Sequence, residues 1–184
     1  EGIITPTSFV AECKPGQFYG FNSRRFKTDP INIPMVYVPR GVDNSTGGFV
    51  VNPDPRFGPL SKTLIGLSFG NSRLYSILRD RQNPKRTQGA VVPLNGMTSS
   101  GICRGAVSPI DGQLYVVGIN GWGDYAVADG CLHRYRYTGT PYEKPTDFSI
   151  HSNGLRIVFA TALHRETAEN ITNFFAQKWG YEYS

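Results

Sequence analysis

The residues that could carry chemistry lie mostly in one stretch, residues 101–139. Arg104 comes early in a strand expected there, and we expect its side chain at the mouth of a channel. An arginine in such a place can bind a carboxylate or a quinone through paired N–H donors. The alternative is a structural salt bridge, on the surface or between neighbouring sheets.

Two aspartates in the glycine-rich loop of residues 118–130 are candidate calcium ligands. Asp124 and Asp129 lie there with Asn120, and oxygen ligands on a flexible loop suit Ca²⁺. Their spacing does not follow the EF-hand pattern, and loop aspartates also make turns with nearby backbone N–H groups. Trp122, in the same loop, would either stack on a sugar or cofactor or cover the end of the sheet.

The histidines do not form a recognisable catalytic or metal-binding pattern. His133 lies in an expected strand beside apolar neighbours, so we interpret it as a structural, hydrogen-bonded histidine. His151 and His164 lie near turns and are expected in solvent. No two histidines have ligand spacing, and the sequence holds no nucleophile elbow, Walker sequence or dinucleotide fingerprint.

The cysteines are far apart in sequence and belong neither to a Cys-x-x-Cys pair nor to a haem-attachment sequence. Two of them begin the first and third of three consecutive strands, about 9–10 Å apart, too far for a disulfide without help from the loops. We therefore interpret the three as small buried residues: Cys13, Cys103 and Cys131.

The elements that must position these residues are strands. The chain has 184 residues with 21 glycines, 13 prolines and only 18% charged residues, which favours an all-β fold. Within residues 101–139, Asp111-Gly112 predicts a tight hairpin between two strands, and a third strand follows the glycine-rich loop. Such a run of strands is typical of one blade of a β-propeller.

Other strands are expected on both sides of this blade. Residues 34–39 form an apolar edge strand bracketed by prolines, and residues 40–59 read as a long loop. Residues 64–67 and 73–78 predict a hairpin, and residues 88–92 the next strand. We expect residues 1–139 to be propeller blades whose strands pair in sequence order.

The last part of the chain changes character. Residues 140–146 read as a linker, and residues 147–184 as the opening strands of an Ig-like β-sandwich. The hairpin turn is expected at residues 152–154, a helical turn at 167–170 and a strand at 174–183. Three aromatic side chains should face one core there: Phe159, Phe175 and Trp179.

Charge and hydropathy exclude two kinds of partner. The formal net charge is +5, but the 19 basic residues are scattered, with short groups such as residues 79–86, so we expect no nucleic-acid binding. No apolar run is long enough to span a membrane. The start of the chain has neither an initiating Met nor the pattern of a signal peptide, so we expect a piece of a longer polypeptide.

Several segments together resemble a known family. The run GPLSKTLIGLSFGNSRLYSILRD, then TQGAVVPL, GICRGAVSPIDGQLYVVGINGWG and CLHRYRYTGTP, resembles the C-terminal blades of glucose/sorbosone dehydrogenase-like β-propellers. The likeness is greatest to the large secreted, haem-containing versions of Planctomycetes-type bacteria. The segments KPGQFYGF and PMVYVPRGVDNSTGGFVV resemble an earlier blade, and residues 148–184 resemble the Ig-like segment that follows the propeller.

The resemblance implies two functions. One is part of a periplasmic or secreted PQQ-dependent sugar or aldose dehydrogenase, with Arg104 near the quinone, bound Ca²⁺, and electrons passed to a c-type cytochrome domain. In that family a histidine of an early blade is the catalytic base, and no residue of this chain matches it. The other is a non-catalytic propeller and Ig-like scaffold or binding module, whose partners are the rest of the polypeptide or other subunits of an extracytoplasmic complex.

Overall fold

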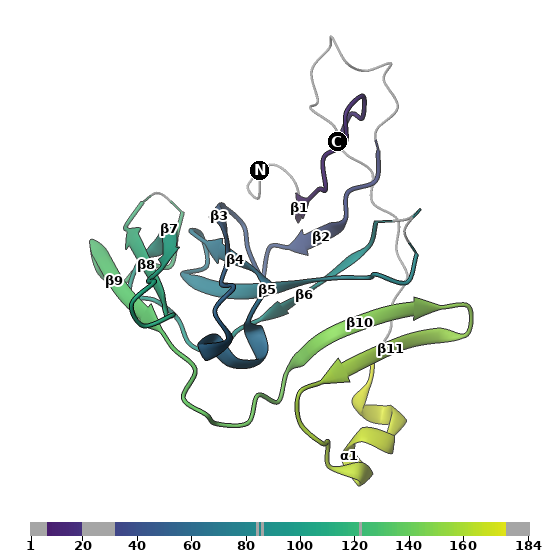
Figure 1. Cartoon of the computed structure of the whole chain (residues 1–184). Helices are drawn as coiled ribbons and strands as arrows, with labels where there is room; N and C mark the ends of the chain where they lie inside the picture. Colours follow the sequence, from purple (N-terminus) through teal and green to yellow (C-terminus); the bar gives the residue numbers. More distant parts are fainter. Residues whose placement is uncertain (1–6, 20–31, 84, 86, 122, 176–184) are drawn as a thin grey trace.

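The computed structural model describes residues 7–19, 32–83, 85, 87–121 and 123–175, and the fold is all-β, as the composition predicts (Figure 1). Two 3-10 turns, η2 and η3, and one short helix, α1, interrupt the strands. The elements are β1 Thr7–Val10, β2 Val36–Pro39, β3 Thr46–Val51, η2 Pro55–Leu60, β4 Leu64–Ser68, β5 Arg73–Arg79, β6 Gly89–Pro93, β7 Gly101–Val107, β8 Leu114–Ile119, β9 Gly130–Tyr135, β10 Pro145–His151, β11 Gly154–Phe159, α1 Arg165–Glu169 and η3 Ile171–Asn173.

The strands form four antiparallel sheets whose members pair in sequence order. The central sheet is β3-β4-β5-β6, followed by β7-β8-β9; β1-β2 and β10-β11 are two-stranded. The sequential order of the strands within each sheet agrees with the prediction, and the described part of residues 60–139 contains no long helix. None of the described helices is long and apolar enough to cross a membrane.

The central sheet is apolar on both faces because a sheet packs on each of them. Ile65, Leu67 and Leu74 of the central sheet pack with Ile102 and Leu114 of β7 and β8. A second cluster lies on the opposite face of the central sheet and joins it to β1 and β2: Val10, Val38, Tyr75 and Ile77. Strands that are buried on both faces lose the strict alternation of polar and apolar residues, which explains the apolar run of β4.

Glycine at position 47 allows the closest approach between two sheets. A Cβ atom there would lie 1.9 Å from the carbonyl oxygen of Ile102, well inside contact distance. Gly47 belongs to β3, a strand that the sequence analysis did not predict, because residues 40–59 were interpreted as a loop. The Asn-Ser-Thr-Gly-Gly run is typical of turns, but here its glycines let β7 pack directly on β3.

The predicted hairpins are confirmed. In the turn between β7 and β8, the Gly112 N–H donates to the Ser108 oxygen at 2.8 Å, and Gly112 has a φ of 70°. Residues 64–67 and 73–78 form most of β4 and β5, and the 152–154 signal marks the two-residue turn between β10 and β11.

A buried carboxylate joins the loop before β3 to the strands of the central sheet. Asp43 is fully buried and accepts hydrogen bonds from four donors. Its Oδ1 accepts from the Ser45 N–H at 3.0 Å and from Ser68 Oγ at 2.6 Å. Its Oδ2 accepts from Thr46 Oγ1 at 2.5 Å and from the Tyr75 hydroxyl at 2.8 Å. A buried charge is tolerated when its oxygens are satisfied in this way.

A second polar contact fixes the β7–β8 turn. The buried Asn52 side chain donates from Nδ2 to the Gly112 oxygen at 2.8 Å and accepts from the Asp54 N–H at 3.0 Å. Arg56 pairs with the Asp54 carboxylate at 2.7 Å and donates to the Ile110 oxygen at 3.0 Å. The segment between β3 and β4 therefore holds the tip of the neighbouring sheet in place.

The tail agrees only in part with the prediction. The hairpin β10–β11 and a helical turn, α1, are present, but α1 begins at Arg165 and β10 begins within the predicted linker, at Pro145. Phe175, which follows η3, is 87% exposed and does not face a core, which corrects the prediction. Trp179 and most of the strand predicted at 174–183 lie outside the described residues.

The close contact at Gly47 predicts a sharp difference between two glycine substitutions. Gly47→Ala should lower the free energy of unfolding by at least about 2 kcal/mol, because its Cβ overlaps backbone that cannot rotate away. Gly41→Ala is the control: a Cβ there meets nothing within 4 Å, so the change should stay within about 0.5 kcal/mol. Urea unfolding measures both, and equal effects would contradict the packing of β3 on β7.

The Asp43 contacts predict a pH effect that depends on Tyr75. Asp43→Ala should lower the free energy of unfolding by about 3 kcal/mol or more, because the buried hydroxyl groups lose their acceptor. Tyr75→Phe should lower it by about 1–2 kcal/mol, because the carboxylate loses one donor. Burial, and then the nearby Asp43 charge, raise the pKa of Tyr75 far above its ordinary value. A raised pKa gives stability that is present below about pH 10 and is lost as the unfolded tyrosine ionises above it.

Urea unfolding at pH 8 and at pH 11 checks this effect. The stability advantage of the wild-type protein over Tyr75→Phe should narrow as the pH rises, since only the wild type carries this hydroxyl. An advantage that stays constant between the two pH values would show that Tyr75 is not buried beside a charge.

Candidate functional site

Arg104 lies on β7, exposed, where it connects two sheets. Its Nη1 donates to the Gly47 oxygen of β3 at 2.8 Å and to its own neighbour, the Cys103 oxygen, at 2.7 Å. No ion pair of Arg104 is found among the described residues. These contacts make the side chain a link between β7 and β3 through backbone oxygens, rather than through the salt bridge considered from the sequence; a role in binding a cofactor stays a prediction.

Asp124 closes the glycine-rich loop. Its Oδ2 accepts from the Gly121 N–H at 2.8 Å and its Oδ1 from the Ala126 N–H at 3.1 Å, so both oxygens cap loop backbone. Asp129 is exposed, and its backbone oxygen accepts from the Asn120 N–H at 2.9 Å. In the described part of the chain, no three His, Cys, Asp or Glu side chains group as metal ligands. Trp122 lies outside the described residues.

The structure also places the histidines and cysteines. The prediction for His133 is confirmed: its Nε2 lies 2.8 Å from Ser99 Oγ and accepts from the Ser99 N–H at 3.3 Å. The cysteines are free thiols, and the prediction that all three are buried is wrong. Cys13 is exposed, whereas the other two are half-buried: Cys103 and Cys131.

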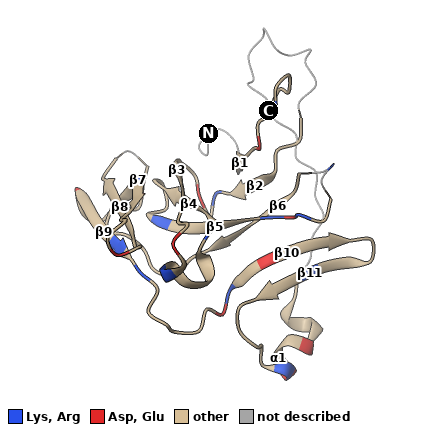
Figure 2. Cartoon of the chain, viewed as in Figure 1, with Lys and Arg blue, Asp and Glu red and all other residues tan. Residues whose placement is uncertain are grey.

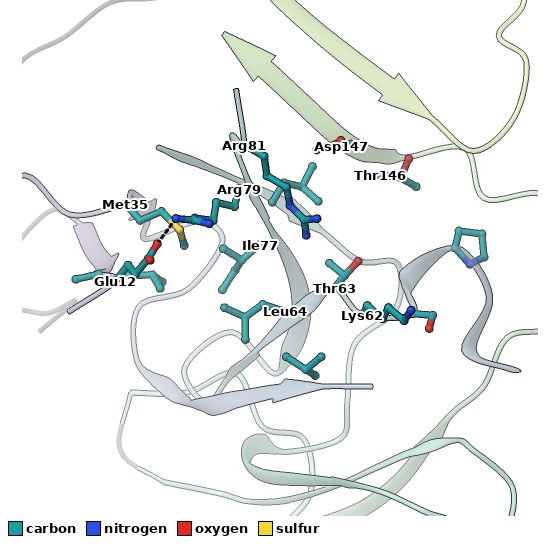
Figure 3. Close-up of a pocket in the computed structure, with 16 residues that line it drawn as sticks. Glu12, Met35, Lys62, Thr63, Leu64, Ile77, Arg79, Arg81, Thr146 and Asp147 are labelled. Atoms are coloured by element: carbon teal, nitrogen blue, oxygen red, sulfur yellow. Dashed lines mark ion pairs between the residues drawn. The ribbon is translucent and has the colours of Figure 1, made fainter. Parts of the chain in front are cut away.

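A cleft of about 610 Å³ at one end of the central sheet is the candidate site (Figure 3). It lies where β3 and β5 end and β4 begins. The wall on one side comes from β1 and the residue before β2, and on the other from the segment after η2; the start of β10 closes a third side. None of the three predicted site residues lines it: Arg104, Asp124 and Asp129.

The floor of the cleft is apolar because strand pairing aligns three aliphatic residues. Val51 of β3 pairs with Leu64 of β4, and Leu64 pairs with Ile77 of β5, so the three side chains share one face of the sheet. Met35 and Val10 also line the cleft, from the β1–β2 side. Ile77 is buried, but Val51 is 46% exposed, so apolar surface is left open to a ligand.

Three cations lie around this apolar floor. Arg79 pairs with Glu12 at 2.8 Å, and the two side chains are 47% and 43% exposed. In Figure 3 the Arg81 guanidinium points into the hollow, and Lys62 lies on the side formed by the segment after η2. Within the described residues neither Arg81 nor Lys62 forms an ion pair, although one carboxylate that is likewise outside any ion pair, Asp147, also lines the cleft.

The backbone around Lys62 places this residue at the edge of the cleft. Lys62 has a φ of 65°, which is uncommon outside glycine, and its backbone N–H donates to the backbone oxygen of the buried Asn52 at 2.7 Å. The tight turn between η2 and β4 thus holds the base of the lysine at the edge of the cleft. Asp147 of β10 is the second carboxylate there and lies on the third side of the cleft (Figure 3).

Sequence reasoning missed this site although part of its signal was visible. Residues 79–86 were noted as a short basic group, but only in the argument against nucleic-acid binding. Figure 2 shows basic residues spread over several elements, in agreement with the scattered charge in the sequence. Nothing in the sequence joins Lys62 to Arg81, because only the pairing of β4 with β5 brings their segments together.

The arrangement is suited to binding an anion. Cationic side chains above an aliphatic floor attract an anion that also carries an apolar group. Comparison of the chain with protein-family models, with curated proteins and with solved structures finds no match. The function of the cleft is therefore inferred from its geometry alone.

The contacts of Arg104 predict a loss of stability on its removal. Arg104→Ala should lower the free energy of unfolding by about 1 kcal/mol, because the hydrogen bond to Gly47 that links β7 to β3 is lost. Arg156→Ala, on exposed β11, is the control and should change it by less than about 0.5 kcal/mol. Unchanged stability of Arg104→Ala, together with a tenfold loss of PQQ affinity, would instead establish a cofactor role.

Proposed function

We propose that this chain is a ligand-binding module whose cleft takes a small anion with an apolar body, such as an aliphatic or aromatic carboxylate. The observation that carries the proposal is the pair of cations Lys62 and Arg81, which form no ion pair with the described residues and lie above the row Val51, Leu64 and Ile77. A cleft of this volume is in the range of small-molecule sites.

The cations and the apolar floor together select the ligand. The carboxylate of the ligand would lie between Arg81 and Lys62, where each contributes charge-assisted hydrogen bonds. The apolar body would cover Leu64 and the exposed part of Val51 and remove that surface from water. Arg79 is already paired with Glu12, so it shapes the wall and adds little net charge.

In this proposal the module is non-catalytic and belongs to a larger periplasmic or secreted assembly, as the family resemblance implies. The sheets β3–β6 and β7–β9 would be successive propeller blades, and β10–β11 the first hairpin of an Ig-like sandwich. The rest of the polypeptide or other subunits would then be its partners. Two consecutive meanders packed face to face support this reading of the architecture.

The second candidate is a PQQ-dependent sugar or aldose dehydrogenase linked to a c-type cytochrome domain. The same two packed meanders favour it, since they are arranged as blades would be. The groups expected to hold its cofactors do not fit well as they stand. Arg104 donates to carbonyl oxygens and Asp124 accepts from two N–H groups, so we derive no step through PQQ or Ca²⁺.

Octanoate tests the proposed ligand class. Titration calorimetry should give a dissociation constant on the order of 0.1 mM, whereas acetate, which lacks the apolar body, and octylamine, which is a cation, should not bind measurably. Arg81→Glu should weaken octanoate binding at least tenfold. Lys62→Gly should weaken it severalfold without loss of stability, because glycine accepts the positive φ at this position.

Arg156→Glu is the control for charge alone, since it changes the net charge as Arg81→Glu does but lies on β11, outside the cleft. Its affinity for octanoate should match the wild type. Absence of octanoate binding, or equal losses in Arg81→Glu and Arg156→Glu, would overturn the proposal. A quinone spectrum after addition of PQQ and Ca²⁺, lost in Arg104→Ala, would favour the second candidate.

A further inference from the structure

Strand β9 leaves its outer edge unpaired. It forms one edge of the sheet β7-β8-β9, and no strand in the described part of the chain lies beyond it (Figure 1). The Asn120 N–H bonds to the Asp129 oxygen, which sets the alternation of bonded and non-bonded pairs along β8 and β9. By this alternation, the backbone N–H and C=O groups of Leu132 and Arg134 point away from β8.

The face beside this edge is apolar and uncovered. Val117 pairs with Leu132 across β8 and β9, so their side chains lie next to each other on one face. Leu132 is 70% exposed, Val117 is 45% exposed and Ile119, two residues along β8, is 56% exposed. Three adjacent exposed aliphatic side chains next to an open edge make a surface on which a further strand could pack.

The charge of this sheet has one sign. Its strands contain Arg104 and Arg134, Arg136 follows directly, and no Asp or Glu occurs within β7, β8 or β9. Two acids flank these strands. Asp129 is exposed and directly precedes β9, and Asp111 lies in the β7–β8 turn. Its Oδ1 accepts from the Gln113 N–H at 3.0 Å and its Oδ2 from the Tyr115 hydroxyl at 2.8 Å, so that carboxylate is already engaged.

A small apolar cavity lies at the C-terminal end of the same strand. It measures about 140 Å³ and is lined by Tyr135 and Tyr137 together with Phe57, Leu74 and Leu94. Tyr135 lies on the face of β9 opposite to Leu132, toward the core. A strand added along β9 would therefore meet an apolar pocket at one end and the exposed aliphatic face beside it.

We propose that the edge of β9 binds an extended segment of a partner protein in which apolar and acidic residues alternate. The partner strand pairs with the outward backbone groups of Leu132 and Arg134, packs an apolar side chain on Leu132 and places a carboxylate by Arg134 or Arg136. Charge complementarity selects this occupant. A second copy of the chain would bring its own Arg134 and Arg136 to the same edge, where like charges repel.

Binding of two synthetic peptides to the whole chain tests the proposal. One alternates Val and Glu over ten residues, and the other has Lys in place of each Glu. The Glu peptide should bind with a dissociation constant in the micromolar range and should slow hydrogen exchange at the Leu132 and Arg134 amides in NMR spectra. The Lys peptide should not bind.

Three variants separate the contributions. Leu132→Pro removes the outward N–H while leaving the pairing with β8, and should abolish binding; Leu132→Ala keeps the N–H and should weaken it only severalfold. Arg134→Glu should weaken binding of the Glu peptide at least tenfold and should allow the Lys peptide to bind. Arg156→Glu, on β11, is the control and should bind the Glu peptide as the wild type does.

The proposal is overturned if the Glu peptide fails to bind at millimolar concentration, if the Lys peptide binds equally well, or if protection appears on another strand. It is also overturned if the free chain dimerises through β9, or if an oligonucleotide protects the same amides and the Glu peptide does not. The outcome is independent of the cleft, because Arg81 and Lys62 do not lie on this sheet.

Discussion

The buried carboxylate of Asp43 is the interaction on which the central sheet depends. Its donors come from the loop before β3 and from three successive strands: Ser45, Thr46, Ser68 and Tyr75. A charge that is out of water is tolerated only while all these donors are present, so it specifies how β3, β4 and β5 align. The alignment in turn sets the row of aliphatic residues at the end of the sheet and hence the floor of the cleft.

The other sheets are held by packing and by backbone contacts. Gly47 lets β7 approach β3 so closely that the Ile102 carbonyl oxygen occupies the space that a Cβ atom at position 47 would take. Arg104 and Asn52 each donate a hydrogen bond to a carbonyl oxygen across the boundary between the sheets β3–β6 and β7–β9. Lys62 and Arg81, which form no ion pair among the described residues, instead line the cleft where β3 and β5 end.

The sequence predicted local structure well and long-range geometry poorly. Asp111-Gly112 and Asn153-Gly154 specify their hairpins through short-range turn chemistry, so those predictions are confirmed. Strand β3 was missed because Gly47 and Gly48 are typical of loops, and only the neighbouring sheet gives glycine a reason to lie in a strand. The cleft could not be predicted, because it joins residues from six separate segments and its cations carry no common motif.

The central claim is that the basic cleft, and not the face around Arg104, receives the ligand. NMR titration of the isotope-labelled chain with octanoate tests it most directly. The account predicts shifts of the Leu64 and Ile77 methyl groups and of the Arg81 side-chain N–H, with the signals of β7 unchanged. Shifts centred on Arg104 and β7, or no shift at saturating octanoate, would contradict it.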